Sequence, residues 1–145
     1  MTGARPRTRA DLHPALARYR AAWTGDDPGA VAELFTADGT RVEVALGRED
    51  RGREAIAGAA VELMAAFVER RLSLEPLMVD DGAWAVEITW RAVHRGAYRG
   101  VPATHRRVEI PGLSIARLEG GLVAVERWYF DAVALGRRLG RSLVG

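Results

Sequence analysis

The sequence predicts an α+β fold in which a long, curved antiparallel sheet forms a cone, with three helices on its concave face. Three observations support this prediction. Apolar residues recur at helical spacing through much of residues 11–70. Four segments with alternating apolar residues then form an antiparallel meander over residues 72–131. One further strand, at residues 40–46, falls between the second and the third helix. The open end of such a cone is a pocket of small-molecule size.

The helices are predicted from their start signals and apolar spacing. Residues 11–24 form the first helix, which Asp11 can cap. A second helix begins at Asp27-Pro28, where a capping residue precedes a proline at the first helical position. The third and longest helix runs over residues 53–70 and has one apolar stripe. That stripe consists of Ile56, Ala60, Leu63, Met64 and Phe67.

The strands are predicted from alternating apolar residues and from the turns between them. Residues 47–52 are a polar connection, and residues 95–104, with glycine and proline, are another. The sequence Asp80-Asp81-Gly82 is typical of a hairpin turn. A bulge or bend is expected near Pro111-Gly112. The predicted strands span residues 40–46, 72–79, 83–94, 105–118 and 122–131.

The length of 145 residues fits one domain. We predict a flexible N-terminal arm over residues 1–10 and a single domain over residues 11–145. No apolar run reaches the roughly 18 residues of a membrane span, and no apolar segment of signal-peptide length follows the basic N-terminus. A cytoplasmic protein with no membrane partner is therefore expected. The absence of cysteine excludes thiol catalysis, disulfides and thiolate metal sites.

All 21 basic residues are arginine, and the formal net charge is +2. Because the arginines are scattered, with no basic stripe among exposed aromatic residues, no nucleic-acid partner is expected. No glycine-rich phosphate loop precedes a helix, so no nucleotide cofactor is implied. The histidines, His13, His94 and His105, lack the spacing of a helical zinc pair, so no metal site is predicted.

Asp131 is the candidate chemical centre. It follows three aromatic residues at the end of the last strand, although aspartate is a poor strand former. Alternation places Arg127, Tyr129 and Asp131 on one face of this strand. If that face lines the cone, the carboxylate can move a proton to or from a carbon acid or a hydroxyl. Alternatively, Asp131 caps a C-terminal segment that begins at Ala132, and the two roles can coexist.

Other candidates are distributed over the predicted helices and strands. His94 ends the apolar face of its strand and lies either at the pocket rim or at a loop edge. Tyr19 and Trp23 lie one helical turn apart, where they either pack in the core or line the pocket. Arg117 is either solvated or a partner for a buried acid. The catalytic candidates are Asp131, Arg117 and His94, and the substrate-binding candidates are Tyr19, Trp23, Arg127, Tyr129, Trp90 and Phe67.

The stretch from residue 89 to residue 140 resembles the SnoaL-like polyketide cyclases, within the nuclear-transport-factor-2-like superfamily. The matching pieces are His94-Arg95-Gly96, Gly100-Val101-Pro102, residues 112–117, Glu126-Arg127-Trp128 with Phe130-Asp131, and Leu139-Gly140. Upstream, residues 19–23, 26–27, 34–39 and 52–56 resemble the opening helices of the family.

The resemblance implies a cone-shaped α+β barrel, usually dimeric, with an active site that needs no cofactor. In these cyclases an aspartate at the position of Asp131 acts as acid and base in an intramolecular aldol ring closure. A histidine on the preceding strand assists it, and here the aligned residue is Arg117, which could hold an enolate or carboxylate. The resemblance thus implies a lyase or isomerase of antibiotic biosynthesis that closes a ring in a hydrophobic, polyketide-like substrate.

Other functions occur on the same scaffold, and the fold does not choose among them. They include ketosteroid isomerases, epoxide hydrolases and cofactor-free hydroxylases. Epoxide opening in this fold relies on two aspartates bridged by an arginine, and the available substitutes for a second aspartate are Glu43, Glu87 and Glu109. A non-catalytic ligand-binding dimer is a further alternative. An open cavity of several hundred Å³ with Asp131 on its wall would favour an enzyme, whereas a cone filled with aromatic residues would favour the binding module.

A homodimer is expected because the strands carry apolar residues on both faces, which need cover on both sides.

Overall fold

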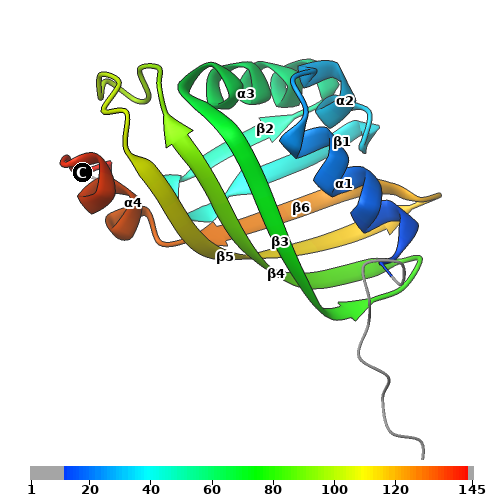
Figure 1. Cartoon of the computed structure of the whole chain (residues 1–145). Coiled ribbons are helices and arrows are strands. Elements are labelled where there is room, and N and C mark those ends of the chain that lie inside the picture. Colours follow the sequence, from blue (N-terminus) through cyan, green and yellow to red (C-terminus); the bar gives the residue numbers. More distant parts are fainter. Residues whose placement is uncertain (1–11, 144–145) are drawn as a thin grey trace, which may run out of the picture.

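The computed structural model describes residues 12–143, which form four helices, one 3-10 turn and a six-stranded sheet (Figure 1). The predicted arm, residues 1–10, lies outside the described residues, as does Asp11. In chain order the elements are α1 (Pro14–Thr24), α2 (Pro28–Ala32), β1 (Phe35–Glu43), η2 (Val44–Leu46), β2 (Arg48–Arg51), α3 (Arg53–Ala66), β3 (Phe67–Val79), β4 (Ala83–His94), β5 (Arg107–Glu119), β6 (Leu122–Phe130) and α4 (Ala132–Leu139). None of these helices is long and apolar enough to cross a membrane.

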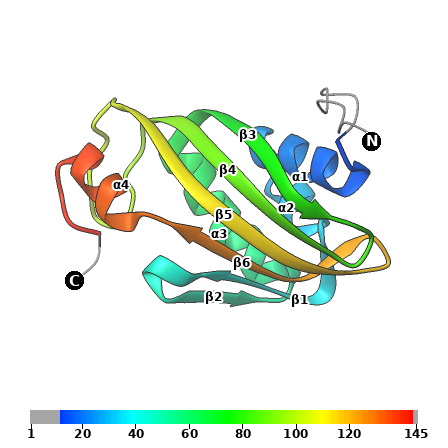
Figure 2. The same cartoon turned by 90° about the horizontal axis from the view of Figure 1, so that it is seen from below.

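The sheet is curved and has the strand order β2-β1-β6-β5-β4-β3. All neighbouring strands are antiparallel except β1 and β6, which run parallel. Helices α1, α2 and α3 lie on one side of the sheet, and α4 lies at one end of it (Figures 1 and 2). The predicted α+β class is therefore confirmed, with two differences: the sheet does not close into a barrel, and it is mixed rather than purely antiparallel.

The C-terminal meander agrees well with the sequence prediction. Strand β4 has the predicted bounds, and the predicted turn before it is stabilised by Asp80, whose Oδ1 accepts hydrogen bonds from the amides of Gly82 (2.7 Å) and Ala83 (2.9 Å). Of the bulge or bend expected near Pro111-Gly112, the bulge is absent, because β5 pairs with β4 in unbroken register through both residues. Gly112 is needed instead for close packing: a Cβ there would lie 2.2 Å from Cη2 of Trp128.

In the first half of the chain, the prediction missed one strand and misplaced both ends of β1 and the end of α3. The polar connection at 47–52 contains strand β2, which pairs with β1 through backbone groups and so needs no apolar residues. Strand β1 starts at Phe35 and gives way to the 3-10 turn η2 at Val44. Helix α3 ends at Ala66, because Phe67 adopts an extended backbone and opens β3. Phe67 is thus a strand residue, although the sequence pattern assigned it to the helix.

The N-termini of α1, α2 and α4 are each capped by a side chain. His13 takes the place predicted for Asp11: its Nδ1 accepts a hydrogen bond from the Ala15 amide at 3.2 Å. The predicted cap at Asp27 is confirmed by a 2.9 Å hydrogen bond from the Gly29 amide. At the other end of the chain, Asp131 caps α4, as one of its two predicted roles requires.

Two apolar clusters form the core. The larger lies between α1, α3 and the sheet, and the smaller lies near α4. Leu63 of α3 packs against both clusters. Arg70 is buried at the edge of the larger one, where its guanidinium donates hydrogen bonds to the backbone carbonyls of Trp23, Phe67 and Gly25. Because these carbonyls belong to the end of α1 and the start of β3, Arg70 joins the two elements.

Candidate functional site

The inner face of β6 carries a buried carboxylate, Glu126, which is 0% exposed. Alternation along this strand directs Glu126 and Trp128 to the helix side and Arg127 and Tyr129 to the opposite side. Strands β1 and β6 place Arg41 directly opposite Glu126 in their parallel register. The buried face of the last strand is therefore the one that does not carry Asp131.

Three donors from three different elements hold Glu126. Its Oε1 accepts a hydrogen bond from Nε of Arg41 (3.0 Å), and its Oε2 accepts from the hydroxyls of Tyr19 and Ser114, both at 2.6 Å. Ser114 in turn accepts a hydrogen bond from Nε1 of Trp84 (3.0 Å). A buried carboxylate is tolerated when it is paired and hydrogen-bonded in this way.

Arg41 joins Glu126 to a second carboxylate. Its Nη1 donates to Oε1 of Glu43 at 2.8 Å, and its guanidinium lies 4.7 Å from the centre of the Trp23 ring. Burial acts to lower the pKa of Arg41, but the charges of Glu126 and Glu43 outweigh it and raise the pKa, so Arg41 remains a cation. The result is a carboxylate–guanidinium–carboxylate bridge whose two acids come from different strands.

Two members of the bridge, Arg41 and Glu43, line a mainly apolar cavity between the helices and the sheet, whereas Glu126 is not among its lining residues. The empty space between the lining atoms is about 600 Å³ including the open mouth, of which the centre of a water molecule can reach about 60 Å³. Tyr98 and Leu135 contribute from the 95–106 loop and from α4. The lining residues are Tyr19, Trp23, Arg41, Glu43, Leu63, Phe67, Leu72, Ile88, Trp90, Tyr98, Ile110, Trp128, Phe130 and Leu135.

The polar side chains that line the cavity differ in their pKa shifts and in whether all their polar atoms have hydrogen-bond partners. Burial, followed by the charge of Glu126, raises the pKa of Tyr19 well above its ordinary value, so its phenol stays neutral. Burial, and then the charge of Glu43, raises the pKa of Tyr98 to about 12. Among residues 12–143, neither Oε2 of Glu43 nor the buried Nε1 of Trp23 has a hydrogen-bond partner. Glu43, which lines the cavity, therefore keeps one carboxylate oxygen free of hydrogen bonds, whereas the unpartnered N–H of Trp23 has no exposed surface.

Four of the nine residues singled out from the sequence line this cavity: Tyr19, Trp23, Phe67 and Trp90. They come from α1, β3 and β4, so the fold brings them together from three elements. Their role as substrate contacts stays a prediction.

The other candidates lie elsewhere: Arg127, Tyr129 and Asp131 are not among the residues that line this cavity. Asp131 is exposed, and its Oδ1 accepts a hydrogen bond from the Ala134 amide at 2.9 Å as the cap of α4. Nε of Arg127 donates to the Tyr129 hydroxyl at 2.9 Å on the outer side of the sheet. Arg117 is likewise exposed and pairs with Glu119 at 2.6 Å. A cavity thus exists, but Asp131 is not on its wall.

His94 is fully buried but is not among the cavity-lining residues. Its Nδ1 accepts a hydrogen bond from the Thr104 amide at 3.2 Å and lies 2.9 Å from the Thr104 hydroxyl. In the described part of the chain its Nε2 has no partner. Burial lowers the pKa of His94, so the neutral ring is favoured.

The sequence interpretation missed Arg41, Ser114 and Glu126 and listed Glu43 only among possible substitutes. Arg41 and Glu43 alternate with valines in the first strand, and two charged residues on one face of a strand are a usable signal. Glu126 lies among apolar residues but shares its strand face with Trp128 and Phe130, which are inner residues. Among the described residues, no group of three or more acidic or histidine side chains could hold a metal ion.

Fold and cavity together define a scaffold for small-molecule chemistry, and the comparison with known families agrees. The chain matches the model of the SnoaL-like polyketide cyclases over residues 13–139. The protein therefore belongs to the SnoaL-like polyketide cyclase family, as the sequence resemblance predicted. A search of curated protein sequences finds no relative of this chain.

Solved structures show the same fold. A hypothetical protein with a ketosteroid isomerase-like fold from Catenulispora acidiphila, in complex with trimethylamine, is 24% identical with a TM-score of 0.76, covering 90% of this chain and 95% of that chain. TsrD from Streptomyces laurentii is 24% identical with a TM-score of 0.76, covering 93% and 98%. IdmH from Streptomyces antibioticus, described as a candidate polyketide cyclase, is 22% identical with a TM-score of 0.71, covering 87% of this chain and 96% of that chain. These similarities establish the nuclear-transport-factor-2-like fold.

Proposed function

We propose that the protein is a cofactor-independent cyclase that closes a ring in a hydrophobic, polyketide-like molecule. The observation that carries this proposal is the bridge Glu43–Arg41–Glu126, of which Glu43 and Arg41 line a mainly apolar cavity. An enclosed apolar site strengthens electrostatic interactions with a reacting group and holds a flexible chain in a reactive conformation. Membership in the cyclase family supports the same reaction class.

Glu43 is the proposed proton acceptor, because it lines the cavity and its Oε2 is free of hydrogen bonds within residues 12–143. In the proposed reaction, Glu43 removes a proton from a carbon next to a carbonyl group. The resulting enolate carbon bonds to a second carbonyl carbon, and the new alkoxide takes the proton back from Glu43. Arg41, which lines the cavity, is suited to stabilise the negative oxygen formed in each step.

Glu126 acts in this scheme as a positioning residue. Hydrogen bonds from Arg41, Tyr19 and Ser114 already occupy its two oxygens, which leaves it little capacity to accept a proton from a substrate. It fixes the orientation of the guanidinium and of the Tyr19 phenol at the cavity wall. Replacing Glu126 by Gln is expected to lower kcat with little change in KM, since the apolar walls that bind the substrate remain.

The chemical assignment is tested by comparing Glu43→Gln with Asp131→Asn, which removes a carboxylate from the exposed cap of α4. Turnover of a linear poly-β-keto substrate to its cyclised product is followed by mass spectrometry. Loss of the acid/base group is expected to slow Glu43→Gln by about 10²–10⁴-fold, whereas Asp131→Asn keeps its rate. If Asp131→Asn is the slow variant and Glu43→Gln is not, the assignment is wrong and Asp131 is the acid/base.

Epoxide hydrolysis is the second candidate, because an arginine bridging two carboxylates is the arrangement that the family resemblance connects with epoxide opening. Glu43 and Glu126 would stand in for the two aspartates. In that reaction Glu43 takes a proton from water as the water oxygen bonds to an epoxide carbon and the C–O bond at that carbon breaks. The alkoxide oxygen so formed then takes the proton back from Glu43. Hydrolysis of an alkyl epoxide in ¹⁸O-labelled water tests it: one labelled oxygen in the diol supports this candidate, and no diol excludes it.

The accessible volume bounds what the closed cavity can hold. The volume of about 60 Å³ that the centre of a water molecule can reach is well below the roughly 300–1,000 Å³ of typical ligand pockets. A polyketide-like chain therefore requires the mouth to widen, and Tyr98 and Leu135 belong to the two segments that would have to move. If no ligand-induced widening occurs and small ligands bind without turnover, the binding module is the better description.

We further propose that the protein is a homodimer, formed through the outer face of the sheet. This face carries large apolar side chains that are well exposed for a soluble protein: Leu77 (63%), Met78 (52%) and Ile115 (41%). Their burial against a second copy would give the sheet cover on both sides.

A further inference from the structure

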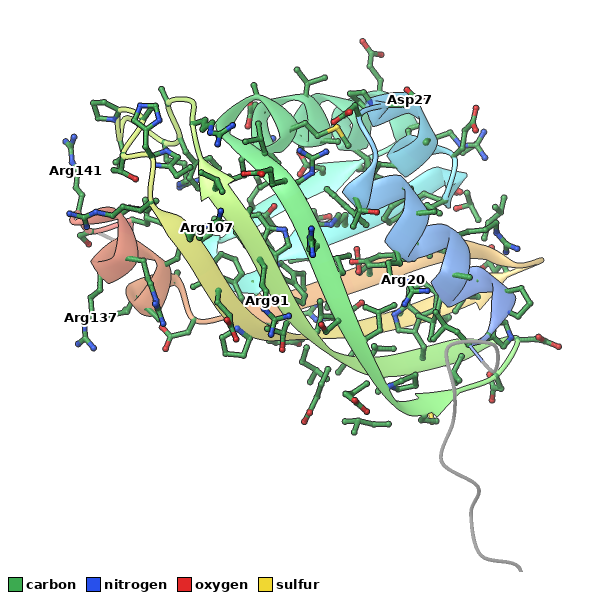
Figure 3. All side chains as sticks on the ribbon, in the orientation of Figure 1. Arg20, Asp27, Arg91, Arg107, Arg137 and Arg141 are labelled. Atoms are coloured by element: carbon green, nitrogen blue, oxygen red, sulfur yellow. The ribbon has the colours of Figure 1, made fainter. Side chains whose placement is uncertain are left out.

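An arginine-walled groove lies at one end of the sheet, beside α4. It is separate from the enclosed cavity and shares no lining residue with it. The groove is open to solvent, and the centre of a water molecule can reach about 400 Å³ of it. Arg91 and Arg107 project from β4 and β5 in this region (Figure 3). Its charged lining residues are Arg71, Arg91, Arg107, Arg138, Glu69 and Glu109.

The positive charge of this groove is not balanced by its own carboxylates. Glu109 pairs with Arg91 at 3.3 Å. Glu69 pairs with Arg95, outside the lining, at 3.4 Å. Within residues 12–143, the guanidinium groups of Arg71, Arg107 and Arg138 have no carboxylate partner. Three guanidinium groups without a carboxylate partner therefore line the same groove.

The register of the sheet places two arginines of the groove directly opposite each other on neighbouring strands. Arg71 on β3 is opposite Arg91 on β4, which in turn is opposite Glu109 on β5. Like charges directly opposite on neighbouring strands destabilise a sheet. Among residues 12–143, Glu109 is the carboxylate that pairs with these two arginines, and it pairs with Arg91 only. An anion bound between the arginines would remove the repulsion.

We propose that this groove binds the phosphate group of a phosphorylated organic ligand. The planar fork of arginine matches the oxygens of a phosphate, and such charge-assisted hydrogen bonds are among the strong ones. Glu69 and Glu109 would repel an extended polyanion that ran the length of the groove. Its lining also contains no aromatic ring on which a base could stack, which disfavours nucleic acid. A compact dianion satisfies all of these conditions.

The groove and the cavity share helix α4. Leu135 lines the cavity, and Arg138, three residues later, lines the groove. A phosphate held by Arg138 would thus lie on the same helix that contributes Leu135 to the cavity lining. This proposal does not depend on the reaction assigned to the cavity, because it rests on a separate set of residues.

The test is a titration of the full chain with inorganic phosphate and with methyl phosphate at constant ionic strength, followed by calorimetry. Saturable one-site binding is expected, and Arg71→Gln and Arg107→Gln should each weaken it by about tenfold, because each removes a charged donor. The control is Arg137→Gln, which removes the same charge from the exposed side of α4 outside the groove lining and should leave the affinity unchanged.

Three results would overturn the proposal. They are the absence of saturable binding, an equal loss of affinity in Arg137→Gln, and tighter binding of an oligoglutamate peptide than of methyl phosphate. The second would indicate attraction to diffuse surface charge, and the third would identify the groove as a docking surface for an acidic protein. Cyclase activity in the same preparations reports on the cavity separately.

Discussion

Replacing Glu126 by Gln should destabilise the protein by about 3 kcal/mol, at the lower end of the roughly 3–5 kcal/mol that removal of one partner of a buried ion pair costs. Glutamine keeps the shape and one acceptor oxygen, so Tyr19 and Ser114 can still donate to it. Its amide NH₂ would, however, meet Nε of Arg41, and two donors cannot bond to each other. The cost is kept low because Glu43 still compensates the charge of Arg41 at 2.8 Å.

The measurement is urea unfolding followed by tryptophan fluorescence, with the slope m expected to be unchanged. The matched control is Glu119→Gln, which breaks the exposed pair between Glu119 and Arg117 at 2.6 Å. Exposed pairs contribute about 0–1 kcal/mol, so the control should unfold almost as the parent does. If Glu126→Gln costs no more than Glu119→Gln, the buried bridge does not hold the site together and the reasoning fails.

Three further predictions concern other parts of the molecule. Burial lowers the pKa of His94, so its contribution to stability is full above its ordinary pKa of about 6.5 and is lost as the pH falls below it. Between pH 7.5 and 5, the free energy of unfolding of His94→Phe, measured with urea, should fall less than that of the parent. An unchanged pH profile would mean that another group causes the fall. Gly112→Ala should cost about 1–3 kcal/mol through overpacking against Trp128. Gly58→Ala, in open space on α3, should instead stabilise by about 0.5–1 kcal/mol; equal effects in thermal melts would contradict the packing argument. Ile115→Glu on the outer sheet face should convert the proposed dimer into monomer in sedimentation, and a monomeric parent would rule the dimer out.

The parts of the fold that could be predicted are those with a local signal. The bounds of β4 follow from strict alternation, and the turn at Asp80 follows from its side-chain hydrogen bonds to the next backbone amides. Strand β2 carries no such signal, because its four residues are charged and it is held by backbone pairing with β1. The end of α3 is similarly hidden, since the apolar pattern continues through Phe67 although the backbone does not.

The site was harder to predict because it depends on which face of β6 is buried. Alternation correctly grouped Arg127 and Tyr129, whereas Asp131 lies just beyond the end of β6 as the cap of α4. Both faces of this strand contain apolar and polar residues. The choice is made by distant partners: Tyr19 on α1 and Arg41 on β1 supply the donors that allow Glu126 to be buried. The arginine groove was missed for the same reason, because its cations are scattered in the sequence and gather only in the sheet.

The pairing of β1 with β6 also has a consequence for how the protein acquires its site during folding. Arg41 and Glu126 are 85 residues apart in the sequence, and Tyr19 and Glu126 are 107 apart. Contacts of such long range require the closure of large loops and form late compared with local ones. On a ribosome, Arg41 and Tyr19 emerge long before Glu126, and until then Arg41 has only Glu43 as a carboxylate partner. A chain that stops before β6 would therefore lack both the Glu126 carboxylate and the strand that pairs with β1 on its inner side, so that activity requires β6 to have been synthesised.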